Sequence, residues 1–74
     1  MVVTYEKIDS WSAVLAYVRE HGGAGYHPPL NYAPVWVKAE VQGNDVLMSP
    51  HHDQGDPFTA DESHLDRFRA RKIT

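Results

Sequence analysis

Residues 34–50, PVWVKAEVQGNDVLMSP, are the stretch that decides the fold. Small apolar residues alternate with larger or polar ones along its first half, and the apolar set is Val35, Val37, Ala39 and Val41. This alternation is typical of a strand with one buried face. Gly43 and Asn44 supply the turn, because both tolerate the positive φ angles of tight hairpin turns. We therefore predict a β-hairpin over residues 35–49.

The position of the turn also predicts which residues face each other across the hairpin. On one side Ala39 faces Met48, which makes this side apolar. On the other side Trp36 faces His51, and Leu47 lies near them among polar groups. Because successive side chains of a strand point to opposite faces, one face belongs to the core and the other carries Trp36.

A helix is predicted over residues 9–21, before the hairpin. Asp9 is the expected N-cap, because its carboxylate can accept the N–H groups of the first turn. Gly22 and Gly23 are expected to end the helix and to give the chain a flexible exit. One face of the helix is apolar at the spacing of helical turns, through Trp11, Val14, Leu15 and Val18.

A second helix is predicted over residues 60–71. Thr59 and Glu62 match a capping box, in which the side chain of each residue bonds the backbone N–H of the other. Leu65 and Phe68 would form a narrow apolar stripe. The segment begins with acidic and ends with basic residues, the polarity that the helix dipole favours.

These elements, with a strand or extended arm over residues 2–7, predict an α+β fold in a single domain, residues 1–74. The sheet would be small and antiparallel, built on the 35–49 hairpin, with helices on one side. The strand–turn–strand portion resembles small SH3-like barrels, without a diagnostic motif. The alternative is therefore such a barrel with an N-terminal helix, in which residues 58–68 hold a short strand and a single turn of helix.

The composition excludes several classes of protein. There are no cysteines among the 74 residues, so disulfides and thiolate metal sites are excluded, as suits a reducing cytoplasm. We expect a cytoplasmic protein, because the N-terminus lacks the pattern of a signal peptide and no apolar run could span a membrane. The net charge of −3 is too mild for a typical nucleic-acid-binding domain.

Five histidines raise the question of a metal site. His51, His52 and Asp53 are weak candidates, because adjacent strand residues point to opposite faces and cannot share one ion. We expect polar turn residues instead, with no cofactor and no metal. No catalytic motif is present, so an enzyme is the less favoured class. Nucleic-acid binding through the basic end of the 60–71 helix is a lesser alternative.

An aromatic segment before and within the hairpin is the most informative surface. Aromatic side chains gathered at a surface are typical of protein interfaces. We expect Trp36 to be covered by another chain, since its strand parity turns it away from the core. The predicted binding surface comprises Tyr26, His27, Tyr32, Trp36, Lys38, Leu47 and His51.

We therefore predict a small cytoplasmic interaction module that acts by protein–protein contact and self-association. The alternative is a small-molecule-binding or enzymatic homo-oligomer with its pocket between subunits. A flat patch around Trp36 would favour the first function, and a concave pocket the second. Small cysteine-free domains of this kind are often associated with phages, plasmids and other mobile DNA, and we expect the same association here.

Overall fold

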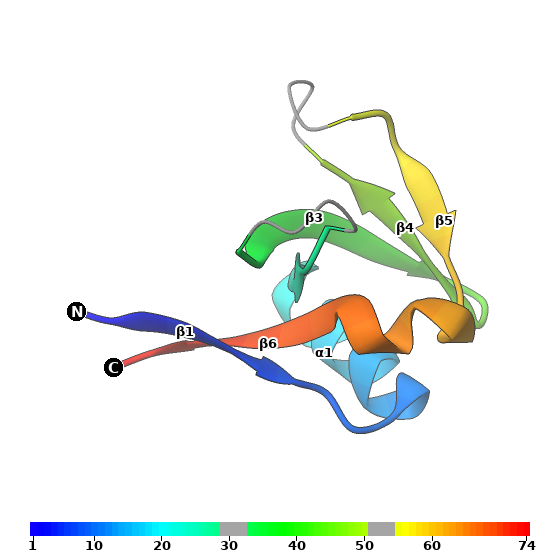
Figure 1. Ribbon diagram of the computed structural model, residues 1–74. Helices are drawn as coiled ribbons and strands as arrows, with labels where there is room; N and C mark the ends of the chain where they lie inside the picture. Colours follow the sequence, from blue (N-terminus) through cyan, green and yellow to red (C-terminus); the bar gives the residue numbers. More distant parts are fainter. Residues whose placement is uncertain (29–32, 51–54) are drawn as a thin grey trace.

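The computed structural model describes residues 1–28, 33–50 and 55–74. Its elements in chain order are β1 (Val3–Lys7), α1 (Trp11–His21), β2 (Gly23–Tyr26), β3 (Val35–Gln42), β4 (Asp45–Ser49), β5 (Phe58–Ala60), the 3₁₀ helix η2 (Glu62–Arg67) and β6 (Phe68–Ile73). The strands form one six-stranded antiparallel sheet in the order β1-β6-β2-β3-β4-β5 (Figure 1). The predicted α+β class, with a small antiparallel sheet, is confirmed.

The hairpin forms as predicted, from β3 and β4. Ala39 lies opposite Met48, and Glu40 lies opposite Leu47. Gly43 occupies the turn with a φ of 65°, a left-handed conformation that favours glycine. The alternation and the position of the turn therefore predicted the faces and the register of this hairpin correctly.

Helix α1 packs its apolar face against the sheet, and the core lies between them. The buried helix residues are those predicted: Trp11, Val14, Leu15 and Val18. The sheet contributes Ala24, Tyr26, Val37, Ala39, Val46, Met48, Ala60 and Phe68. The ring of Phe68 meets the rings of Trp11 and Tyr26 edge to face, each with 5.4 Å between ring centres.

The start of α1 differs slightly from the prediction. Ser10, and not Asp9, is the N-cap, and its hydroxyl accepts the N–H of Ala13 at 3.2 Å. Gly22 ends the helix in the expected left-handed conformation, with a φ of 69°. The glycines that follow are not a flexible exit, however. Gly23–Tyr26 is strand β2, a central strand between β6 and β3.

The predicted helix over residues 60–71 is wrong. Thr59 lies in β5 opposite Leu47, and Asp61 is the residue that caps η2. The capping box is formed by Asp61 and His64, so the box lies two residues later than predicted. In this segment the structure follows the alternative, which placed a short strand and a turn of helix here.

Pairing with distant strands explains why β6 is extended. A helix here would leave β1 without its partner and one side of β2 without hydrogen bonds, whereas β6 pairs with both. Leu65 and Phe68 alone gave only a narrow apolar stripe. Helix propensity is a weak preference that tertiary contacts override.

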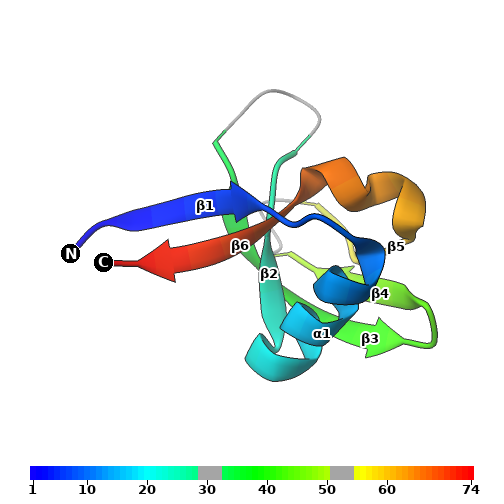
Figure 2. The same cartoon turned by 90° about the horizontal axis from the view of Figure 1, so that it is seen from below.

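Strands β1 and β6 form a two-stranded ribbon that projects beyond the body of the molecule, with both chain ends at its tip (Figures 1 and 2). Backbone bonds between Val2 and Thr74 extend the pairing past the end of each strand. Strand β1 is therefore one edge of the sheet, and β5 is the other. In the described ranges, no helix has the length and apolar character needed to cross a membrane.

Candidate functional site

One face of the sheet gathers aromatic and cationic side chains. Residues opposite each other in antiparallel strands share a face, and Trp36 lies opposite Gly25, Gly25 opposite Arg69, and Arg69 opposite Lys7. Tyr5 lies opposite Arg71 in the same ribbon, and Lys38 follows Trp36 by two residues. We call this surface the aromatic–cationic face; its members are Tyr5, Lys7, Trp36, Lys38, Arg69 and Arg71.

This face is distinguished by its charge. It carries four of the seven lysines and arginines of a chain whose net charge is −3. Along the sheet it continues to Glu40 and Leu47, which lie opposite each other. Strand alternation turns all of these side chains away from the buried Val37 and Ala39.

Two glycines of β2 leave room for the aromatic rings of this face. A Cβ atom at Gly23 would lie 2.8 Å from Cζ2 of Trp36, and one at Gly25 would lie 2.5 Å from Cδ1 of Tyr5. Both distances are too short for any side chain. Between the two glycines, Ala24 points into the core and is fully buried.

Arg71 covers the ring of Trp36. Its guanidinium carbon Cζ lies 3.9 Å from the centre of the indole ring, which is a cation–π contact. The ring of Tyr17, from α1, meets the indole edge to face at 6.2 Å between ring centres. Trp36 is therefore half-buried within its own chain, and Arg71 and Tyr17 supply in part the cover that we expected from a second chain.

The Tyr17 hydroxyl also takes the place of a strand partner for β6. It accepts the backbone N–H of Arg71 at 2.9 Å and lies 3.5 Å from the backbone oxygen of the same residue. Strand β2 pairs with β6 only at Tyr26 and Gly25, so at Arg71 this hydroxyl satisfies backbone groups that β2 does not reach. The backbone of Arg71 is thereby fixed on the side away from β1.

The predicted site residues fall into three groups. Trp36, Lys38 and Leu47 share the face opposite the core, as expected. Tyr26 is a core residue, 8% exposed, so it is not available on the surface; burial raises its pKa, and the charge of Arg67 opposes this. His27 is half-buried and bonds Arg67 twice. Its backbone N–H donates to the backbone oxygen of Arg67 at 2.7 Å, and its carbonyl oxygen accepts from Arg67 Nη1 at 3.4 Å. The remaining predicted residues lie outside the described part: Tyr32, His51, His52 and Asp53.

Sequence reasoning missed Tyr5, Tyr17, Arg69 and Arg71. The signal was present in residues 69–73, RARKI, where two arginines at alternate positions would share one face of a strand. In the predicted helix over residues 60–71 the same arginines would be spread around the helix surface, so no common face was expected. Among the described residues, no group of three or more His, Asp or Glu side chains is placed to hold a metal ion.

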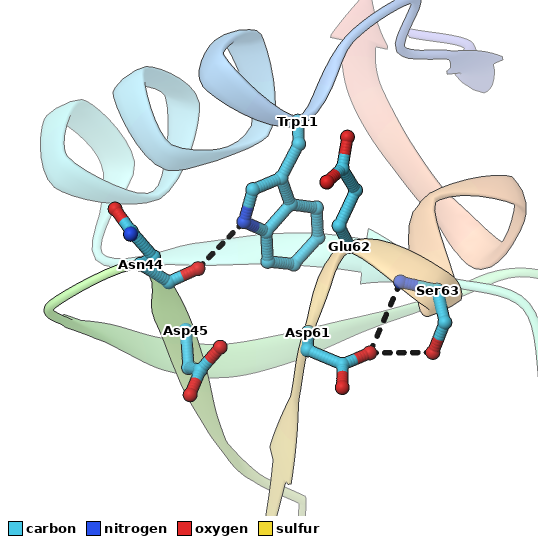
Figure 3. A pocket seen from close by; sticks show the side chains of 6 residues that line it. All are labelled: Trp11, Asn44, Asp45, Asp61, Glu62 and Ser63. Atoms are coloured by element: carbon cyan, nitrogen blue, oxygen red, sulfur yellow. Dashed lines mark hydrogen bonds between the residues drawn. The ribbon is translucent and has the colours of Figure 1, made fainter.

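A separate open pocket of about 380 Å³ lies beside Trp11 (Figure 3). Its lining residues are Trp11, Asn44, Asp45, Asp61, Glu62 and Ser63. Trp11 Nε1 donates to the backbone oxygen of Asn44 at 2.6 Å, and Ser63 N–H donates to the carboxylate of Asp61 at 3.0 Å. The Ser63 hydroxyl and N–H lower the pKa of Asp61. These polar groups therefore serve the fold, by capping η2 and by tying the hairpin turn to α1.

No protein-family model matches this chain, and no curated protein or solved structure matches it at a significant level.

Proposed function

We propose that this chain is a small binding module whose aromatic–cationic face holds a protein partner through a carboxylate group. The observation that carries the proposal is the stack of Arg71 on Trp36, at 3.9 Å. Stacking fixes the plane of a guanidinium and leaves its N–H groups at the rim, where they can bind both oxygens of one carboxylate. The ion pairs within the described residues involve other side chains, so none of them occupies Arg71.

The aromatic rings of this face are covered by other groups of the chain, which favours a protein partner over a nucleic acid. Proteins that hold single strands stack bases on exposed aromatic rings. Here the Trp36 ring lies close to Gly23 and under the guanidinium of Arg71. Tyr5 likewise rests on Gly25. Arginine edges around covered rings suit carboxylates, and Leu47 adds an apolar contact at the rim of the face.

Charge disfavours self-association through this face. Two copies meeting face to face would bring the lysines and arginines of both faces close together, and like charges in contact cost several kcal/mol. An acidic segment of another protein meets no such repulsion. The cysteine-free composition supports a cytoplasmic setting for this interaction, and the association with mobile DNA remains a prediction.

Binding of a fluorescent peptide of alternating glutamate and leucine residues tests the proposal. Arg71→Lys keeps the charge but loses the planar fork, so we expect it to weaken binding by tenfold or more, on the order of 1.4 kcal/mol. Arg19→Lys is the matched control, because Arg19 is exposed on α1 and should leave binding unchanged.

Two results would contradict the proposal. Equal affinities of the parent and Arg71→Lys for the peptide would show that the stacked guanidinium does not recognise carboxylates. A single-stranded oligonucleotide that binds more tightly than the peptide, and is released by Arg71→Lys, would assign the face to nucleic acid instead.

A further inference from the structure

The exposed large apolar residues of the described part gather at one place. They are Met1 at 98% exposure, Val2 at 58%, Val3 at 45% and Ile73 at 55%. All four lie at the tip of the β1–β6 ribbon, which projects from the body (Figure 2). Single exposed apolar residues need no explanation, but an apolar cluster on an edge strand is a typical contact site.

The free edge of β1 can pair with another strand. Val2 and Thr74 exchange both of their backbone hydrogen bonds, so Val2 points its backbone groups toward β6. In an antiparallel ladder this alternates, and the N–H and C=O groups of Val3, Tyr5 and Lys7 therefore point away from β6 to the open side. The other edge, β5, is only three residues long, so it offers much less to a pairing strand.

We propose that two copies of this chain associate through their β1 strands, paired antiparallel about a two-fold axis at Thr4. In this register every residue from 1 to 7 has a partner. Each Val3 lies opposite Tyr5 of the second copy, and these pairs exchange two backbone hydrogen bonds each. The two six-stranded sheets would become one continuous sheet.

Charge and strand length favour this register over the registers centred on Tyr5 and Glu6. With the axis at Glu6, two carboxylates would face each other, which is destabilising. With the axis at Tyr5, Met1 and Val2 would lie opposite Asp9 and Ile8, which are beyond the end of β1. With the axis at Thr4, Glu6 lies opposite Val2 and Lys7 lies opposite Met1, so no two like-charged side chains face each other.

This contact differs from the proposed binding surface and adds to it. Val3, Tyr5 and Lys7 have their side chains on the aromatic–cationic face but use their backbones for pairing. Pairing at β1 would therefore set the faces of two copies side by side. A dimer would present two Arg71–Trp36 stacks on one surface.

Disulfide trapping tests the register, because the chain has no cysteine of its own. Thr4 would face Thr4 of the second copy in a non-hydrogen-bonded pair, with Cα atoms about 4.5 Å apart, within the range of a disulfide. Thr4→Cys should cross-link completely under mild oxidation at low concentration. Glu6→Cys is the matched control, since it lies on the same strand and face and should cross-link no faster than Ser12→Cys on the exposed side of α1.

Sedimentation of the full chain provides the second measurement. The parent should form dimers that dissociate on dilution, and Val3→Lys should be monomeric at concentrations where the parent is dimeric, because a lysine would replace the apolar contact at the edge. Thr59→Lys on β5 should leave the dimer intact. A parent that is monomeric throughout, or Thr4→Cys that cross-links no faster than Ser12→Cys, would overturn the proposal.

Discussion

Gly23→Ala should destabilise the fold, because Gly23 leaves room for the ring of Trp36. A Cβ atom at this position would lie 2.7 Å from the carbonyl oxygen of Val37, 2.8 Å from Cζ2 of Trp36 and 2.9 Å from its Cε2. The two ring contacts are each at least roughly 0.6 Å closer than the optimum for carbon atoms. Either the indole must move or β2 must separate from β3, and both lose packing.

The expected cost is about 1–3 kcal/mol, the usual range for adding a methyl group to a packed site. A domain of this length has a free energy of unfolding of roughly 4–11 kcal/mol, so the loss is a large fraction of the total. Each kcal/mol lowers the Tm of a domain this small by about 4–8 °C. Glycine to alanine in an unhindered strand would instead stabilise slightly, by reducing the entropy of the unfolded chain.

A double-mutant cycle with Trp36→Ala separates the ring contact from other effects. With the indole removed, Gly23→Ala should cost less, and the coupling energy should be about 0.5–3 kcal/mol. Gly25→Ala is the matched control on the same strand, because the atoms nearest to its Cβ belong to Tyr5 and Arg69. Equal costs of Gly23→Ala with and without Trp36, measured by urea denaturation, would refute the placement of the ring on Gly23.

The remaining predictions concern Tyr17 and Asp61. Tyr17→Phe should cost about 0.5–1.5 kcal/mol and speed amide exchange at Arg71, because it removes the hydroxyl that bonds this backbone; unchanged exchange would contradict the contact. Asp61→Ala should lower the denaturation midpoint at neutral pH, whereas Thr59→Ala should not. The Ser63 hydrogen bonds lower the pKa of Asp61 in the folded state, so their stabilisation is present above the unfolded-state pKa and is lost as the pH falls through the folded-state pKa. The gap in unfolding free energy between the parent and Asp61→Ala should therefore narrow in acid; a constant gap would contradict a titrating cap.

The hairpin could be predicted because its information is local. The alternation along β3 and the turn at Gly43 lie within one short stretch, and together they specify both the faces and the register. The apolar face of α1 could be predicted for the same reason. In both cases neighbouring residues carry the pattern, so no distant partner had to be known.

Strand β6 could not be predicted because its partners are distant in sequence. Its pairs with β1 join residues such as Tyr5 and Arg71, which lie at opposite ends of the chain. The order of charges over residues 60–72 fits a helix dipole, and it also fits a strand with arginines on one face. The strand is favoured over the helix because it pairs with the edges of β1 and β2, and these edges exist only in the folded sheet.

The candidate site could be predicted only where its features depend on neighbouring residues in the sequence. The orientation of Trp36 follows from strand parity, which is local. The cover of Trp36 does not, because it combines Tyr17 from α1, Gly23 from β2 and Arg71 from β6. Because β6 was predicted as a helix, the sequence did not indicate that the guanidinium of Arg71 covers the indole of Trp36.

The three contacts around Trp36 matter for binding because they order Arg71 before any partner arrives. The Tyr17 hydroxyl bonds the backbone of Arg71, the indole of Trp36 contacts its guanidinium, and Gly23 leaves room for that indole. Immobilising a long side chain on binding costs about 0.5–1.5 kcal/mol, and here much of that ordering is completed by folding. A lysine at position 71 would keep the charge but not the stacked planar group. The loss of affinity on Arg71→Lys would therefore report the contribution of the stacked planar guanidinium, separately from that of its charge.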